Sequence, residues 1–92
     1  MQNIECQKEM TIKNRLGLHA RAAAQLVKTA NRFTSEVKIS KDRVTANGKS
    51  IMGVLTLAAA MGSTIRIQCQ GPDATEAMSA LEKLIDAKFH ED

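Results

Sequence analysis

The sequence predicts an α+β fold, a two-layer sandwich in which one face of a sheet packs on helices and the other face meets water. Three observations support this prediction. Apolar residues recur with the periods of strands and helices, in the order βαββαβα, along the 92 residues. Polar and apolar residues alternate along every predicted strand, which is typical of an antiparallel sheet with one solvated face. Each predicted helix carries one apolar face, which fits a single layer of helices on the sheet.

The first half of the chain is predicted to form a strand, a helix and a hairpin. Residues 8–13 alternate between apolar and polar side chains, as a half-buried strand does. From residue 20 to residue 32, apolar positions follow the i, i+3, i+4, i+7 spacing of an amphipathic helix. Its predicted buried face consists of Ala23, Leu26, Val27 and Ala30. Residues 36–40 and 43–46 alternate again on either side of a Lys-Asp turn, which predicts a hairpin.

The second half begins with a short helix and a strand. Ser50 is a good N-cap residue for a helix over residues 51–57, because its hydroxyl can accept a hydrogen bond from a helical N–H group. Gly62 ends that region. Residues 64–69 form the clearest alternating segment of the chain and are predicted to be a strand.

The chain is predicted to end in a helix over residues 74–88. Asp73 and Glu76 have the spacing of a capping box, in which the first side chain caps the helix and the second reaches back. The predicted buried face of this helix consists of Ala77, Leu81, Leu84 and Ile85. The segment after it, which includes His90, is expected to be a frayed tail.

Length and composition favour a function carried on the surface. Residues 1–92 are expected to form a single domain with a modest core, too small to enclose a deep active site and a cofactor. There is no Trp or Tyr, and Phe33 and Phe89 are the only aromatic residues, which argues against single-stranded nucleic-acid binding. The net charge of +3 comes from 13 basic and 10 acidic residues. The basic residues are scattered, so no DNA-binding stripe stands out.

The sequence also predicts a cytosolic protein without membrane insertion. Its first ten residues lack the apolar core of a signal peptide, and no run approaches the ~18 apolar residues of a membrane span. Cys6 and Cys69 lack CxxC spacing, and we expect them to be reduced structural cysteines. His19 and His90 are the only histidines, and no ligand spacing links them. No metal site and no cofactor are therefore expected.

The candidate functional site is the stretch GLHARAAAQLV, from Gly17 to Val27, which places a histidine and an arginine at a predicted helix start. The first N–H groups of a helix lack intrahelical partners and lie at the positive end of the helix dipole, which favours a bound anion. Arg21 would add a permanent charge and a planar set of donors. The imidazole of His19 is a competent nucleophile, so a phosphoryl group carried on it would meet these donors. On spacing alone, an exposed loop histidine beside an exposed arginine is the simpler interpretation.

Two segments of the chain resemble a known family. GLHARAAAQLVKTANRF and NGKSIMGVLTLAAAMGSTI are similar to HPr, the histidine-containing phosphocarrier family of the bacterial phosphoenolpyruvate-dependent phosphotransferase system. The similarity extends from about Lys8 to Leu84. It implies an open-faced sandwich of four antiparallel strands covered on one face by three helices. It also implies a stoichiometric phosphoryl carrier, which is not a catalyst in the usual sense, and a monomer is the simplest expectation.

By this resemblance, His19 accepts a phosphoryl group on Nδ1 from Enzyme I and passes it to an Enzyme II A component during sugar uptake. Arg21 matches the arginine of the family motif and would stabilise the phosphate together with the backbone N–H groups of Ala20, Arg21 and Ala22. The family usually has proline where this chain has Ala22. Alanine adds an N–H donor near the anion site, and we expect phosphoryl transfer to survive at an altered rate.

The resemblance also implies a regulatory site and a docking surface. Ser50 matches the serine that an ATP-dependent kinase, HPr kinase/phosphorylase, modifies in the family where the cell has one. HPr docks its donor and its acceptor through its first two helices, so we expect some large apolar residues of the short helix to be exposed. The residues assigned to this docking surface are Leu16, Ala24, Lys28, Ile51, Met52 and Leu55.

Three other functions are compatible with the sequence. The nitrogen-related branch of the family, NPr, acts mainly in regulation, and the acidic ending FHED and the missing proline leave that assignment open. A plain interaction domain would use the apolar surface alone, with His19 never phosphorylated. A small nucleic-acid-binding domain is disfavoured by the scarcity of aromatic residues and of clustered basic residues.

Overall fold

The computed structural model describes residues 3–91, which form one sheet, three α-helices and a short terminal turn. In chain order the elements are β1 (Ile4–Thr11), α1 (Ala20–Ala30), β2 (Glu36–Lys41), β3 (Val44–Asn47), α2 (Ile51–Leu55), β4 (Thr64–Gly71), α3 (Ala74–Asp86) and η1 (Lys88–His90). The order βαββαβα predicted from the sequence is confirmed.

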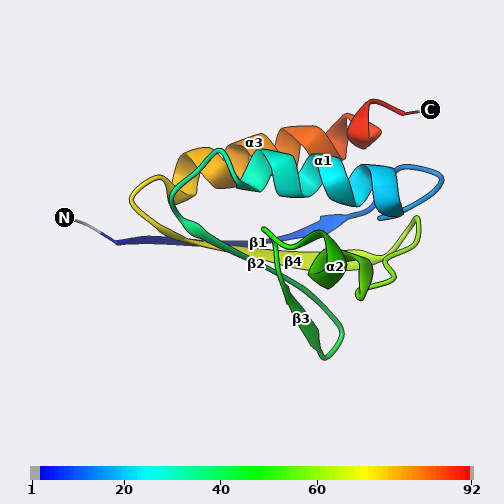
Figure 1. The fold of residues 1–92 in the computed structure, drawn as a ribbon, viewed down its shortest axis with the longest axis horizontal. Helices are drawn as coiled ribbons and strands as arrows, with labels where there is room; N and C mark the ends of the chain where they lie inside the picture. Colours follow the sequence, from blue (N-terminus) through cyan, green and yellow to red (C-terminus); the bar gives the residue numbers. More distant parts are fainter. Residues whose placement is uncertain (1–2, 92) are drawn as a thin grey trace.

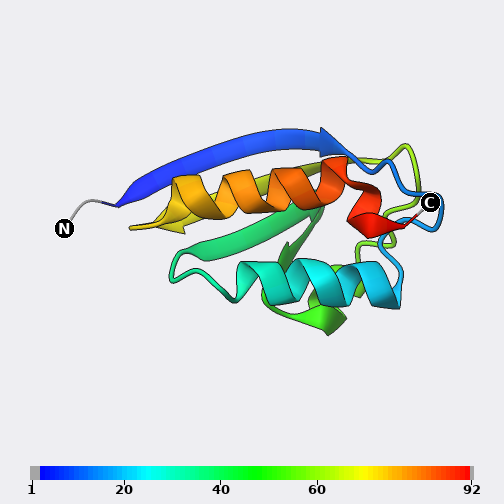
Figure 2. The same cartoon turned by 90° about the horizontal axis from the view of Figure 1, so that it is seen from above.

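The four strands form one antiparallel sheet in the order β1-β4-β2-β3. β4 therefore pairs on both sides, with β1 and with β2. α1 and α3 run side by side over one face of the sheet, and α2 packs against α1 and β3 (Figures 1 and 2). Side chains along β4 alternate between buried and more exposed positions, because the opposite face meets water. The predicted open-faced sandwich is confirmed.

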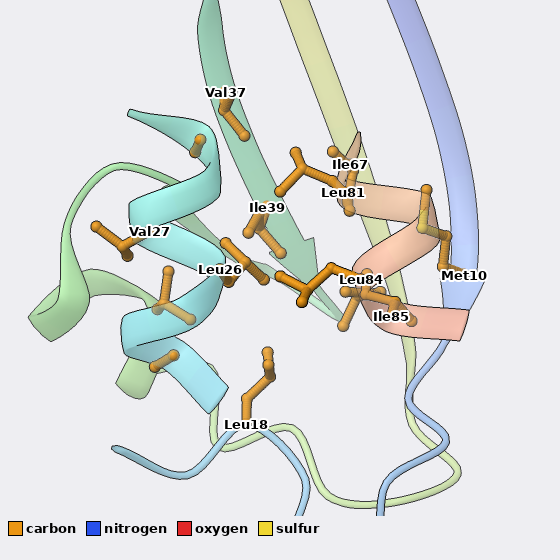
Figure 3. Packing of buried hydrophobic residues seen from close by; sticks show 14 of the residues in the cluster. Met10, Leu18, Leu26, Val27, Val37, Ile39, Ile67, Leu81, Leu84 and Ile85 are labelled. Carbon is orange, nitrogen blue, oxygen red and sulfur yellow. The ribbon is translucent and has the colours of Figure 1, made fainter. Parts of the chain in front are cut away.

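The core lies between the sheet and the two long helices. Figure 3 shows Leu26 of α1 pointing toward Leu84 of α3, with Ile39 of β2 next to Leu26. The predicted inward faces of both helices are confirmed, since all their members are buried. Each fully buried Leu or Ile side chain contributes about 1.5–3 kcal/mol. This packing holds α1, and with it the start of α1, in one place on the sheet.

Several element boundaries differ from the prediction. β1 begins four residues earlier, at Ile4, because Ile4 and Cys6 pair with the last residues of β4. Both side chains are only half-buried on an edge strand, which leaves a weak alternation in the sequence. The helices also end slightly before their predicted residues, at Ala30, Leu55 and Asp86.

The capping box predicted from Asp73 and Glu76 does not form. Asp73 stands at the N-cap position of α3, but its side chain accepts no hydrogen bond from the helix. Its carboxylate instead accepts from the N–H of Thr34 at 2.9 Å and from the N–H and hydroxyl of Ser35 at 2.8 and 2.5 Å. These bonds, that of the Ser35 hydroxyl first, lower the pKa of Asp73. Asp73 therefore ties the turn before β2 to the start of α3.

Candidate functional site

A tight loop between β1 and α1 positions His19. Gly17 has φ +66°, a left-handed conformation that glycine adopts readily. A β-carbon at Gly17 would lie 2.4 Å from the carbonyl oxygen of Ala59, so the position also has no room for a side chain. The next residue, Leu18, is buried and donates its N–H to the same oxygen at 2.8 Å. The loop is therefore held in one conformation directly before His19.

His19 is the N-cap residue of α1. Its backbone is extended (φ −75°, ψ −178°), and its carbonyl accepts the N–H of Ala23 at 2.8 Å. Within residues 3–91, the N–H groups of Ala20, Arg21 and Ala22 donate no hydrogen bond, as expected for a first helical turn. The side chain of His19 is 29% exposed. The imidazole therefore lies at the amino end of the helix, as predicted, and remains open to solvent.

The end of the chain returns to this site. After α3, Lys88, Phe89 and His90 form a turn with φ between 54° and 59°. Phe89 is fully buried and anchors this turn in the core, and the red turn lies at the same end of the molecule as the start of α1 (Figure 2). Glu91 then places its Oε2 atom 2.7 Å from Nε2 of His19. The prediction of a frayed tail after α3 is therefore wrong for residues 88–91, which are held against the rest of the structure.

Asn14 holds the carboxylate of Glu91 in place. The side chain of Asn14 is fully buried, and its Nδ2 donates to the carbonyl of Gly17 at 2.8 Å and to Oε1 of Glu91 at 2.9 Å. The hydrogen bond from Asn14 is the main cause that lowers the pKa of Glu91, followed by the bond with His19. The positive charge of Arg21 acts in the same direction. Neither Asn14 nor Glu91 was predicted as a site residue from the sequence, because no local motif links them to His19.

Arg21 follows His19 by two residues and lies in the first turn of α1. Its side chain is exposed and makes no ion pair within the described part of the chain. Its positive charge contributes to the lowered pKa of Glu91, after the hydrogen bonds from Asn14 and His19. A phosphate-sized anion at the start of α1 would therefore meet this cation as well as the free N–H groups.

Ser50 is the N-cap residue of α2, as predicted. Its Oγ accepts the N–H of Gly53 at 3.0 Å. The side chain is half-buried, and α2 packs against α1. A charge added to Ser50 would therefore enter at the start of a helix that neighbours α1.

Large apolar side chains on α2 are exposed. Met52 and Ile51 are 76% and 42% exposed, and Leu55 is half-buried. The other members of the predicted docking surface are exposed as well: Leu16, Ala24 and Lys28. Met61, which is not among the predicted docking residues, is a further exposed apolar residue. Two large exposed apolar side chains, Ile51 and Met52, follow each other on the short helix α2, which is compatible with a protein contact.

The described part of the chain contains no candidate metal site and no disulfide. No group of three or more His, Cys, Asp or Glu residues in that part could hold a metal ion. Cys6 and Cys69 lie opposite each other on β1 and β4 as free thiols. No helix among the described residues is long and apolar enough to cross a membrane.

Known proteins match the chain over nearly its whole length. Residues 6–87 match the family described as "PTS HPr component phosphorylation site". The phosphocarrier protein HPr of Cupriavidus necator is 51% identical over 85 residues, which cover 92% of this chain and 96% of that protein. The phosphocarrier protein NPr of Shewanella violacea is 42% identical over 85 residues, covering 92% of this chain and 93% of that protein.

The fold matches as well. A crystal structure of HPr from Thermoanaerobacter tengcongensis superposes with a TM-score of 0.91 at 41% identity, covering 95% of this chain and 98% of that one. The likeness therefore extends over nearly the whole of both chains. This chain belongs to the HPr family of phosphocarrier proteins of the phosphotransferase system.

Proposed function

We propose that this protein carries a phosphoryl group on His19, taking it from phosphoenolpyruvate-charged Enzyme I and giving it to an Enzyme II A component. The observation that carries this proposal is the solvent-accessible imidazole at the amino end of α1, beside three N–H groups without partners in the described structure and an exposed guanidinium. The family supports it, because its matching relatives include phosphocarrier proteins.

The groups around His19 suit a transferable phosphoryl group. The N–H groups of Ala20, Arg21 and Ala22 lie at the positive end of the α1 dipole, where they favour phosphate oxygens. Ala22 supplies an N–H that proline in its place would lack. Fixed donors of this kind stabilise the charge of the transferred group without a further acid or base. The protein is consumed and regenerated in each cycle, so we propose that it acts as a carrier and not as an enzyme.

The docking surface would serve both exchange partners in turn. His19 has to meet a donor and then an acceptor, so the same neighbouring surface must fit two different proteins. Met52 is the most exposed large apolar residue of α2, and its flexible side chain adapts to different contacts. Leu16 precedes His19 in the same loop and would lie at the edge of either contact.

We propose Ser50 as a second modification site, for HPr kinase/phosphorylase in a cell that has this enzyme. A phosphate on Ser50 would add about −1.5 to −2 charges beside the docking surface. The fold would tolerate it, because negative charge is favourable at a helix start. Because the added negative charge lies beside the docking surface, Ser50→Asp should slow phosphorylation of His19 by Enzyme I. Because the fold tolerates the charge, its circular dichroism spectrum should remain unchanged.

The nitrogen-related function is the second candidate. The NPr of Shewanella violacea, 42% identical to this chain, motivates it. Transfer from the phosphorylated protein to sugar-specific and to nitrogen-related Enzyme II A components separates the two, because the physiological acceptor should be phosphorylated faster at equal concentration.

The decisive experiment is incubation of the protein with Enzyme I and phosphoenolpyruvate, followed by intact mass spectrometry. The native chain should gain the mass of one acid-labile phosphoryl group. His19→Ala should gain none, and His90→Ala, which removes the other histidine, should behave like the native chain. A native chain that gains no phosphate would contradict the proposal and favour a plain interaction domain.

A further inference from the structure

The carboxylate of Glu91 contacts the ring nitrogen that is opposite the proposed point of phosphorylation. Oε2 of Glu91 lies 2.7 Å from Nε2 of His19. We propose that Glu91 is a positioning residue for phosphoryl transfer, which keeps the ring hydrogen of His19 on Nε2 and leaves the lone pair of Nδ1 to attack phosphorus. This inference rests on the proposed function.

The location of the hydrogen follows from the partners of the two groups. An ionised carboxylate can only accept hydrogen bonds, whereas a neutral imidazole has one donor and one acceptor nitrogen. Oε1 of Glu91 already accepts from Nδ2 of Asn14 at 2.9 Å, and these contacts keep the pKa of Glu91 low. The hydrogen between Oε2 and Nε2 therefore belongs to the ring, and Nδ1 carries no hydrogen.

Glu91 is held by groups other than His19, so it can impose this arrangement on the ring. Phe89, two residues earlier, is fully buried. The side chain of Asn14 is also fully buried and is itself fixed by its bond to the carbonyl of Gly17 at 2.8 Å. The side chain of Glu91 is only 13% exposed, less than that of His19 at 29%. The carboxylate is thus the fixed member of the pair, and the imidazole orients to it.

The transfer step then needs no proton to enter or leave the ring. The Nδ1 lone pair forms a bond to phosphorus while the bond between phosphorus and the nitrogen of the donor's phosphohistidine breaks, and its electron pair stays with the donor. The ring of His19 becomes a cation that still carries its hydrogen on Nε2, next to the negative carboxylate of Glu91. On donation, the bond between Nδ1 and phosphorus breaks, and its electron pair returns to Nδ1 to restore the neutral ring.

Arg21 and Glu91 would act on different groups during the transfer. The guanidinium of Arg21 and the N–H groups of α1 are suited to the phosphoryl oxygens, whereas Glu91 balances the positive ring. Removal of the carboxylate should therefore affect the ring and the transfer rate while leaving the fold intact.

The test combines a spectrum of the unphosphorylated protein with a transfer rate. Two-bond proton–nitrogen-15 NMR, at a pH where the ring is neutral, should show only the Nε2–H tautomer of His19 in the native chain. Glu91→Ala should show a measurable fraction with hydrogen on Nδ1, and its phosphorylation by Enzyme I should be about three- to ten-fold slower. Glu91→Gln, which keeps an acceptor oxygen without the charge, should fall between the two.

Glu5→Ala is the matched control, because it removes an exposed carboxylate on β1 that makes no ion pair within residues 3–91. It should match the native chain in both measurements. If Glu91→Ala keeps the native tautomer, or changes the tautomer without slowing transfer, the positioning role is overturned. A native chain that accepts no phosphate refutes the proposed function and the transfer role together, whereas the tautomer measurement still decides whether Glu91 orients the ring.

Discussion

Replacement of Gly17 by alanine should destabilise the protein through the loop that holds His19. Gly17 has φ +66°, where an L-residue costs about 1–2 kcal/mol. The new β-carbon would lie 2.4 Å from the carbonyl oxygen of Ala59, whereas ordinary contact begins at 3.4 Å, so this backbone must move by about 1 Å. That oxygen also accepts the N–H of Leu18, so the movement adds about 1–3 kcal/mol of cost. We expect a total loss of about 2–5 kcal/mol in the free energy of unfolding.

Gly62 provides the matched control for this measurement. It also has a positive φ, +89°, but nothing lies within 4 Å of a β-carbon built there. Gly62→Ala should therefore lose only the conformational penalty of about 1–2 kcal/mol. Urea unfolding followed by circular dichroism gives both losses. If Gly17→Ala proves no less stable than Gly62→Ala, the contact with Ala59 does not constrain the loop, and the reasoning is refuted.

Three further predictions concern the cap of α2, the buried thiol and the carboxylate of Asp73, which ties the turn before β2 to the start of α3. Ser50→Ala removes the acceptor of the Gly53 N–H and should lower the free energy of unfolding by about 1 kcal/mol. Ser50→Asp keeps an acceptor and should lose less. Equal losses for the two variants in urea unfolding would count against the capping role. At about pH 8 a disulfide reagent such as DTNB should modify half-exposed Cys6 and spare Cys69, because burial raises the pKa of Cys69 to about 11 and leaves about 0.1% of it ionised. Two reactive thiols in the native protein would disprove this. Asp73 has a lowered pKa, so its stabilisation is complete above the ordinary pKa of an aspartate and is lost as the pH falls through the lower folded-state value. The native protein should therefore lose unfolding free energy between about pH 6 and about pH 2, and Asp73→Asn, which cannot titrate there, should lose less over the same range. An equal loss for the two proteins in urea unfolding would contradict the assigned role of Asp73.

The long helices could be predicted from the sequence because helical position is a local property. The repeat of 3.6 residues places Leu26 of α1 and Leu81 of α3 on buried faces, whatever those faces pack against. The cap at Ser50 is local in the same sense, because its partner N–H lies three residues away. The position of His19 at a helix start followed from the same short-range pattern.

Asp73 shows where a local pattern was insufficient. Its spacing to Glu76 fits a capping box, yet its carboxylate binds donors of Thr34 and Ser35, which lie far away in the sequence. Three donors converge there because the fold brings the turn before β2 beside the start of α3. The choice between a local partner and these distant partners depends on the tertiary structure, which the local spacing does not contain.

The sequence by itself determined the order of the elements, their buried faces and the placement of an imidazole and a guanidinium at one helix start. Each of these depends on residues within a few positions of one another. Only the tertiary structure decided that Glu91 and Asn14 meet His19, because 72 residues separate Glu91 from His19 and 77 separate it from Asn14. The physical cause is the burial of Phe89, which turns the chain end back onto the core and brings a carboxylate to the ring.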